Sequence, residues 1–345
     1  MDTRLNENLK DIQQNYIAPF LWLHNEPDDD IISEIERIYE SGIRSVCIES
    51  RTHEEFCCEG WWSDVKLIFD KCRELGMNVW ILDDKHFPTG YSNGIFKEKY
   101  KHLQAFGICE QHMDVPGPIK DGSAIAECWL ECDEDEIVKV SALKHIPNTE
   151  RYSEIIDITD GLSDGMVYFD LPEGMWRIVF MIKTKRGRSL NNQSFFDVLN
   201  PETIDLFIEE IYESHYKHFS EYFGNTFLGF FSDEPSFSNN TKNTFITAIG
   251  IPFAHYPWHD SMKEYINIEH LAGLWFDIDG VTEDFRYSYM DTITNEYKNN
   301  FNDKLSNWCH EHNVMYIGHV IEDNNAHSKT GNGAGHYLHV LLQRI

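Results

Sequence analysis

The stretch 226–237, TFLGFFSDEPSF, decides how the chain folds. A run of apolar and aromatic residues ends abruptly at Ser232, and Asp233, Glu234 and Pro235 follow. A continuous apolar run is typical of a strand covered on both faces, as in a parallel sheet wrapped by helices. Because proline cannot donate a hydrogen bond to a neighbouring strand, the strand is predicted to end there. The two carboxylates then stand at the carboxyl end of a buried strand, which is the catalytic end in barrel enzymes.

The first hundred residues repeat this pattern. Apolar runs at 17–23, 43–48 and 77–82 predict strands, with helical patterns at about 28–41 and 61–75 between them. Aspartates open the first helix, where the helix dipole favours negative charge, and a glycine follows each helix as a stop signal. Strands that alternate with helices at this spacing indicate a parallel sheet with helical crossovers.

The pattern changes between about 106 and 190. Short alternating segments, separated by Asp-Gly and Glu-Gly pairs, predict an inserted antiparallel β domain of the sandwich type. It divides the barrel into a first part, 1–105, and a second part, 191–345, which adds a short strand at 314–317. Five parallel strands are thus predicted where a closed barrel has eight. Either the sheet is open, or the chain is a truncated part of a longer enzyme. We expect the second: an α/β protein with a (β/α)8 TIM-barrel-like catalytic domain that is incomplete at its C-terminus.

Composition excludes several classes of partner. The chain has 58 acidic and 29 basic residues, a net charge of −29, which disfavours binding to nucleic acid or to an anionic membrane. No stretch approaches the ~18 consecutive apolar residues of a membrane span, and the N-terminus lacks a signal-peptide pattern. The eight cysteines are scattered and are expected to be reduced. A cytoplasmic location is the expectation.

Polar residues follow every predicted parallel strand, and the carboxyl ends of such strands converge on one crevice. Crowded carboxylates raise at least one pKa, which a general acid at neutral pH requires. Two carboxylates, one acting as acid and one as base or nucleophile, are the machinery of glycoside hydrolysis. We therefore predict Glu234 and Glu322 as the catalytic pair. The remaining strand-end residues are predicted to bind substrate: His24, Glu49, Asp83, Asp84, Asp233 and His319, with Trp22 and Tyr91 among several aromatic rings suited to stacking on sugars (also Trp61, Trp62, Phe87, Phe237 and Trp258).

Metal signals are weaker. The pairs His319-x-x-Glu322 and His336-x-x-His339 have spacings that suit metal ligands on a helix, but no H-E-x-x-H motif or cysteine cluster occurs. The oxygen-rich strand ends suit Ca²⁺ better than zinc. No metal ligand is assigned from the residues themselves.

Four motifs in the same order resemble the large bacterial enzymes of glycoside hydrolase family 106, the α-L-rhamnosidases, and their relatives. They are Asp83-Asp84 with PTGYSNG at 88–94, DVLNPE at 197–202, Phe231-Ser232-Asp233-Glu234-Pro235, and Gly318-His319 with Glu322. The resemblance covers about 16–337 and implies a (β/α)8 domain that hydrolyses a glycosidic bond, with Glu234 and Glu322 matching motif glutamates. Members of such families can need calcium. Asp84-Lys85 departs from the acidic pair of the family pattern.

Three functions stay open. The first is a glycosidase that acts on an oligosaccharide or glycoside. The second is a carbohydrate-binding remnant that keeps the sugar cleft without turnover. The third is a metal-dependent hydrolase that uses His319, Glu322 and His336.

Overall fold

The computed structural model describes residues 17–51, 53–186, 194–235 and 249–319. The chain divides into two compact units. The first unit is drawn from Met1–Leu103, Ser194–Ser236 and Asn299–Ile321, and the second from Gln104–Gln193, Phe237–Lys298 and Glu322–Ile345. Each unit is therefore assembled from segments that are distant in sequence. The domain boundaries expected from the sequence stay a prediction.

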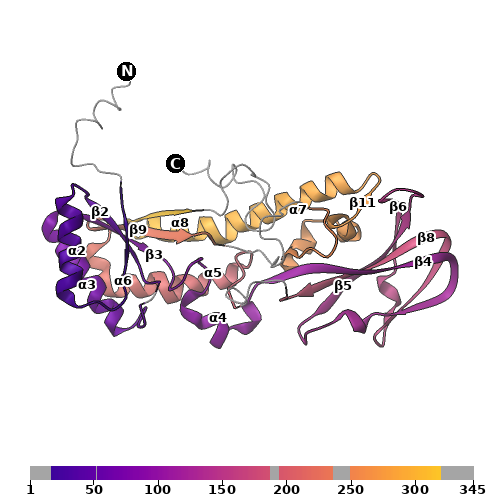
Figure 1. Cartoon of the computed structure of the whole chain (residues 1–345), viewed down its shortest axis with the longest axis horizontal. Helices are drawn as coiled ribbons and strands as arrows, with labels where there is room; N and C mark the ends of the chain where they lie inside the picture. The colour runs from indigo at the N-terminus through magenta and orange to yellow at the C-terminus, as the bar shows by residue number, and fades with distance from the viewer. Residues whose placement is uncertain (1–16, 52, 187–193, 236–248, 320–345) are drawn as a thin grey trace, which may run out of the picture. The chain divides into compact units, whose positions relative to one another are not determined.

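A five-stranded parallel sheet forms the centre of the first unit (Figure 1). Its order is β1-β2-β3-β9-β12, and each neighbouring pair is parallel. The strands are β1 (Phe20–Trp22), β2 (Ser45–Glu49), β3 (Asn78–Leu82), β9 (Phe227–Asp233) and β12 (Met315–His319). All five residues of β2 are buried, as expected for a strand covered on both faces. The predicted parallel sheet is confirmed, whereas its closure into a barrel stays a prediction.

Helices α2 (Asp28–Glu40) and α3 (Glu59–Leu75) make the first two crossovers (Figure 1). Helix α2 starts with three aspartates, where backbone N–H groups lack partners within the helix, and buries Ile31 and Ile35. Helix α3 ends at Gly76, whose φ of +66° belongs to the left-handed conformation that glycine adopts at helix ends. Local sequence signals therefore set the start of α2 and the end of α3.

Longer helical segments lead to the last two strands of this sheet. Between β3 and β9 run α4 (Ile95–Glu98), α5 (Pro201–Phe207), a π-helical stretch and α6 (Ser214–Phe219). Asn200 caps α5 by accepting a hydrogen bond from the Glu202 backbone N–H at 3.0 Å. Between β9 and β12 run α7 (Thr282–Tyr297), a π-helical stretch and α8 (Asp303–Glu311).

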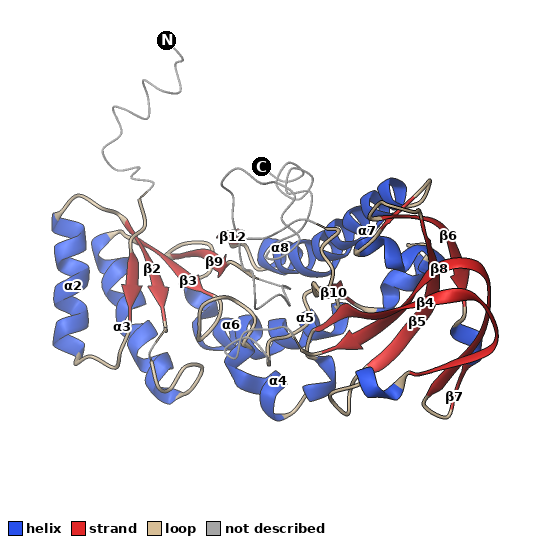
Figure 2. Cartoon of the chain, turned by 45° about the vertical axis from the view of Figure 1, so that its right-hand side comes forward, coloured by secondary structure: helices blue, strands red, loops and turns tan. Residues whose placement is uncertain are grey.

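The second unit contains one curled, mixed sheet of half-barrel form rather than the two packed sheets of a sandwich (Figure 2). Its order is β10-β4-β8-β5-β6-β11, and β7 pairs with β8. Most pairs are antiparallel, but β11 runs parallel to β6. The strands are β4 (Phe106–Ile125), β5 (Glu136–His145), β6 (Arg151–Asp157), β7 (Leu162–Ser163), β8 (Met166–Thr184), β10 (Tyr256–Trp258) and β11 (Asp277–Ile278).

Strand β4 was not expected from the sequence. It is 20 residues long and contains Pro116, Gly117, Pro118 and Gly122, which are typical of loops. The structure places register shifts in its pairing with β8 at Gly117–Ile119 and at Ile119–Gly122, so these residues bend the strand without ending it. Such irregularities are one way in which a sheet curls instead of splitting into two layers.

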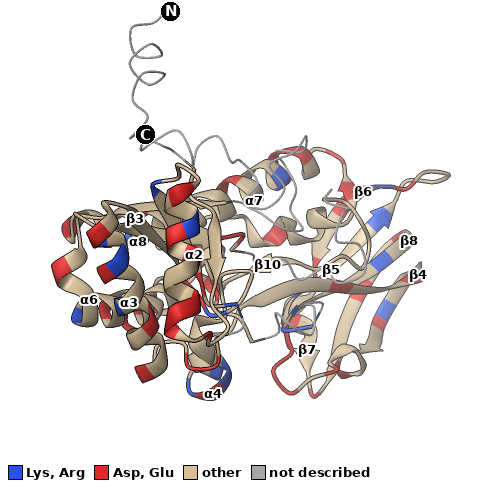
Figure 3. Cartoon of the chain, turned by 60° about the vertical axis from the view of Figure 1, so that its left-hand side comes forward, with Lys and Arg blue, Asp and Glu red and all other residues tan. Residues whose placement is uncertain are grey.

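Acidic residues cover helices of both units, including α2 and α7 (Figure 3). The second unit has its own core of buried apolar side chains, including Val140, Trp176 and Phe180. Among the described residues, the structure contains no helix with the length and apolar character needed to cross a membrane.

Candidate functional site

Asp233, Glu234 and His319 meet at the carboxyl edge of the parallel sheet. The His319 Nδ1 atom lies 3.1 Å from Glu234 Oε1 and 3.5 Å from Asp233 Oδ1. Strands β9 and β12 are paired in parallel so that His319 lies beside Asp233. The Glu234 N–H donates to the His319 carbonyl at 2.8 Å, and Glu234 has a left-handed φ of +47°. Non-glycine residues in this conformation are concentrated at functional sites.

Opposing effects act on the pKa of the Asp233 carboxyl group. Burial is the larger effect and raises the pKa of this carboxyl above the usual value, whereas the neighbouring His319 and Arg51 side chains lower it. Asp233, Glu234 and His319 thus come together at one edge, whereas the pairing of Glu234 with Glu322 stays a prediction because Glu322 lies outside the described residues. His319 comes from β12, 86 residues after Asp233 in sequence, so only the parallel pairing brings them together.

Asp83 lies directly after β3 and is fully buried. It accepts hydrogen bonds from three hydroxyl groups: Thr89 Oγ1 at 2.8 Å, Tyr212 Oη at 2.7 Å, and Ser232 Oγ. Tyr316 of β12 in turn donates to Ser232 at 2.9 Å. Burial raises the pKa of Asp83 to about 7, and the three hydrogen bonds oppose that rise. Asp83 therefore ties β3, β9, β12 and the helical segment at 208–213 into one network.

Asp84 is also fully buried and organises the following loop. Its Oδ2 atom accepts from the backbone N–H groups of Gly90 at 2.9 Å and Ser92 at 2.8 Å. Its Oδ1 atom accepts from Lys85 at 2.7 Å and Asn93 at 3.3 Å. Burial raises the pKa of Asp84 to about 6, and these backbone donors lower it. The carboxyl groups of Asp83 and Asp84 are both buried and accept hydrogen bonds from protein groups. Their predicted role in binding a sugar directly stays a prediction, and their burial does not favour it.

The loop shaped by Asp84 is also attached to β9. The Thr89 N–H donates to the Asp233 carbonyl at 2.8 Å, and the Asp233 N–H donates to Thr89 Oγ1 at 2.9 Å. Since Thr89 Oγ1 also donates to Asp83, one threonine couples the loop, the buried aspartate and the strand that presents Glu234. The aspartates thereby hold the backbone of the site in place.

Glu49 stands at the end of β2 with a buried side chain, and Arg51 Nε donates a hydrogen bond to its Oε1 atom. Burial raises the pKa of Glu49, while Arg51 and a hydrogen bond with Trp22 lower it. Sequence reasoning missed Arg51. The available signal was a basic residue two positions after a strand-end glutamate.

The other predicted site residues occupy different places. His24 pairs with Glu26 at 2.8 Å and lines a groove of about 440 Å³ along β1. Tyr91 belongs to the loop after β3, with its ring 4.7 Å from that of His86. Glu322, His336, His339 and Phe237 lie outside the described residues. Of the aromatic rings considered for sugar stacking, Trp61, Trp62 and Trp258 are buried core residues, whereas Trp22 and Phe87 are exposed.

Asp233, Glu234 and His319 are also the one group in the described part of the chain with three candidate metal-ligand atoms close together, all within 4.8 Å of one another. Calcium prefers six to eight oxygen ligands. Two carboxylates and an imidazole do not make such a site by themselves, so these residues alone do not fit calcium. Carboxylate and imidazole ligands together suit transition metals better.

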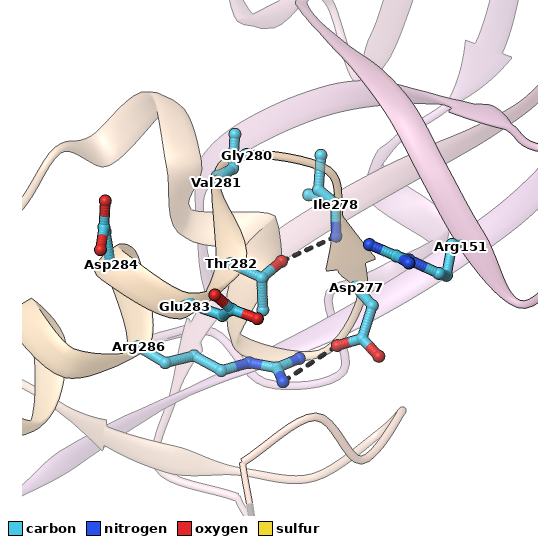
Figure 4. A pocket seen from close by; sticks show the side chains of 9 residues that line it. All are labelled: Arg151, Asp277, Ile278, Gly280, Val281, Thr282, Glu283, Asp284 and Arg286. Carbon is cyan, nitrogen blue, oxygen red and sulfur yellow. Dashed lines mark hydrogen bonds and ion pairs between the residues drawn. The ribbon is translucent and has the colours of Figure 1, made fainter.

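A separate pocket of about 600 Å³ lies in the second unit, at the start of α7 (Figure 4). Its Arg286 pairs with Asp277 at 3.0 Å, and the backbone N–H of Ile278 donates to Thr282 at 2.7 Å. Arg151, another lining residue, pairs with Asp279 at 2.5 Å. Of the charged lining residues, Arg286 and Asp277 thus pair with each other, and Arg151 pairs with a residue outside the lining.

No protein-family model and no curated protein matches the sequence. Among solved structures, the chain is similar to the rhamnosidase from Novosphingobium sp. PP1Y, with a TM-score of 0.56 and 10% sequence identity. The match covers 91% of this chain and 47% of that chain, so this chain spans about half the length of the enzyme. At this identity the likeness concerns the fold alone. The resemblance to a rhamnosidase that the motifs indicated is therefore confirmed at the level of the fold.

Proposed function

We propose that the chain is a glycoside hydrolase that cleaves a glycosidic bond at the carboxyl edge of its parallel sheet, within a (β/α)8-type barrel. The observation that carries this proposal is the meeting of Asp233, Glu234 and His319 at that edge, in a fold similar to that of a rhamnosidase. Cleavage of this kind needs a proton for the leaving oxygen and a second carboxylate that activates water or attacks the anomeric carbon.

Glu234 is our candidate for the proton donor, and Glu322 for the second carboxylate. Three features support Glu234: its position directly after β9, the left-handed backbone that turns it out of the strand, and its contact with His319. The imidazole of His319 can orient the carboxyl group, and Asp233 adds negative charge close by. Asp83 and Asp84 act on this chemistry indirectly, because they hold the backbone that carries it.

The first prediction concerns Glu234. Glu234→Gln keeps the shape of the side chain but removes the transferable proton, so turnover of an aryl-glycoside should fall by about 10²–10⁴-fold. Activity should be measured on a panel of chromogenic aryl-glycosides that includes α-L-rhamnoside, with thermal unfolding to check the fold. Glu74→Gln, at the end of α3, is the matched control because it alters an exposed glutamate of the same unit. Unchanged turnover in Glu234→Gln would remove this residue from the mechanism.

A metal-dependent hydrolase is the second candidate, and one observation favours it. The Asp233, Glu234 and His319 side chains offer ligand atoms within 4.8 Å of one another. The purified protein should be examined for stoichiometric transition metal by elemental analysis, and the aryl-glycoside panel repeated with chelator and with added calcium. Bound transition metal and loss of activity on chelation favour this candidate; activity that is indifferent to chelation favours the paired carboxylates.

A carbohydrate-binding protein without turnover is distinguished by measuring oligosaccharide binding alongside the panel. It would bind oligosaccharide and release no reducing sugar.

A further inference from the structure

Arg51 lies between two exposed aromatic rings near the candidate catalytic residues. It follows β2 by two residues, and its Cζ atom is 4.6 Å from the ring centroid of Trp22 and 5.1 Å from that of Phe87. Trp22 is 46% exposed, Phe87 is 42% exposed, and the Arg51 side chain is 34% exposed. Stacking of a guanidinium on aromatic rings is favourable and fixes its plane. Two large apolar rings therefore reach the surface with a cationic donor group fixed between them.

Glu49 holds this arginine by one edge. Arg51 Nε donates to Glu49 Oε1, and the Glu49 side chain is only 2% exposed. Within the described residues, neither terminal nitrogen of Arg51, Nη1 or Nη2, has a hydrogen-bond partner. A guanidinium carries five N–H donors, so the two terminal nitrogens leave four of them for a ligand.

The charge around Arg51 is already compensated. The Glu49 carboxylate accepts its hydrogen bond, and the Arg51 charge also attracts the Asp233 carboxylate, which opposes the burial that raises the pKa of Asp233. Glu234 lies beside Asp233 and adds a further carboxylate. A ligand carboxylate or phosphate would meet these negative groups as well as the guanidinium. A neutral ligand avoids this repulsion and still receives the N–H donors of Arg51.

We propose that Trp22, Arg51 and Phe87 form a subsite for a neutral, hydroxyl-bearing sugar ring. The C–H faces of such a ring pack on the exposed parts of Trp22 and Phe87, and its hydroxyl groups accept hydrogen bonds from Arg51 Nη1 and Nη2. Glu49 is the positioning residue that keeps the guanidinium in place. This assignment rests on the proposed glycosidase function and adds that the sugar unit bound here is neutral rather than acidic.

Binding measured without turnover tests the subsite. The probes are a panel of neutral and uronic-acid sugars that includes L-rhamnose and the pair methyl β-D-glucoside and methyl β-D-glucuronide, which differ only at C6. Titration calorimetry should show that the full chain binds neutral members more tightly than their acidic counterparts. Arg51→Gln should weaken neutral-sugar binding by about tenfold, the effect of losing one or two hydrogen bonds. Arg51→Lys should also weaken it, because a point charge does not reproduce the planar fork.

Arg44→Gln is the matched control. Arg44 directly precedes β2, and its Cζ atom stacks 4.0 Å from the ring centroid of Tyr39. Its Nη1 atom donates to the backbone carbonyls of Tyr39 and Ile43, so this arginine binds backbone near the amino end of β2. Sugar binding by Arg44→Gln should equal that of the unaltered protein. Thermal unfolding of each variant shows whether a loss of binding reflects a loss of fold.

Three results would overturn the subsite: no binding of any neutral sugar by the unaltered protein, tighter binding of the uronic acid, or folded Arg51 variants with unchanged affinity. The outcomes also separate the two proposals. If sugar binding depends on Arg51 while no glycoside is hydrolysed, the subsite stands and the glycosidase proposal fails. If glycosides are hydrolysed and the KM of folded Arg51→Gln is unchanged, the glycosidase proposal stands and the subsite fails.

Discussion

Asp83 is a carboxyl group that the fold buries completely and surrounds with hydroxyl donors from Thr89, Tyr212 and Ser232. Burial removes water from the charged form and raises its pKa to about 7. The three hydrogen bonds favour the charged form but do not cancel this effect. The hydrogen-bond network of Asp83 therefore contains a group that gains or loses a proton near neutral pH.

This equilibrium predicts the direction in which stability changes with pH. An unfolded aspartate ionises near pH ~4, whereas folded Asp83 does so near pH 7. Between these values the folded protein binds more protons than the unfolded chain, so stability falls as pH rises from about 4 to about 7. Each unit of pKa difference corresponds to about 1.4 kcal/mol.

Asp83→Asn cannot ionise and should therefore lose less stability than the unaltered protein between about pH 5 and about pH 8. Urea unfolding at both pH values measures the difference. Part of the decline should remain, because burial raises the pKa of Asp84 to about 6 as well. An equal decline in both proteins would show that Asp83 ionises normally.

The pairing of β9 with β12 depends on a close approach between their backbones. Gly229 lies beside Met315, and a Cβ atom on Gly229 would come 1.9 Å from the Met315 carbonyl oxygen. Real Cβ atoms do not approach an oxygen so closely, so any side chain at this position forces the strands apart. The same two strands carry Asp233 and His319, which places the requirement for glycine at the base of the candidate site.

Gly229→Ala should destabilise the protein by about 3 kcal/mol, because a clash with backbone is not relieved by turning a side chain. It should also lower glycosidase activity by separating His319 from Asp233 and Glu234. Gly42→Ala is the control: Gly42 has a φ of +93° but open space around its Cβ position. Its cost should be near 1 kcal/mol, from backbone strain alone. Chemical denaturation measures the stability of both variants. Equal losses of stability in Gly229→Ala and Gly42→Ala would argue against the close approach.

Over the whole molecule, negative charge is in large excess. The net charge is −29, and acidic residues are distributed over helices of both units (Figure 3). Like charges within a folded protein repel each other and destabilise the folded state. Ions screen this repulsion over a Debye length of about 10 Å at 0.1 M salt.

We therefore expect added NaCl to raise the unfolding temperature by a few degrees between about 10 mM and about 300 mM, as calorimetry would measure it. KCl should act equally if the effect is screening. A fall in the unfolding temperature with both salts would mean that the many ion pairs outweigh the net repulsion.

Local patterns predicted the parallel strands, their helices and the polar residues at their ends, since continuous apolar runs and helix stop signals depend on few neighbours. They failed for β4, where prolines and glycines typical of loops bend a strand instead of ending it. They also gave no means of separating a strand-end acid that faces outward from one that is buried. Asp233 ends β9 and Asp83 follows β3, yet Asp83 receives hydrogen bonds from residues 129 and 149 positions away.

The sequence by itself therefore indicated that Glu49, Asp83, Asp233 and His319 lie at strand ends, because the end of an apolar run is encoded locally. Only the tertiary structure decided what each of them does there. It buried Asp83 and Asp84 as supports, brought His319 to Asp233 and Glu234, and fixed Arg51 between Trp22 and Phe87. The physical reason is that burial, hydrogen-bond partners and charge neighbours all come from distant segments, and no local pattern records them.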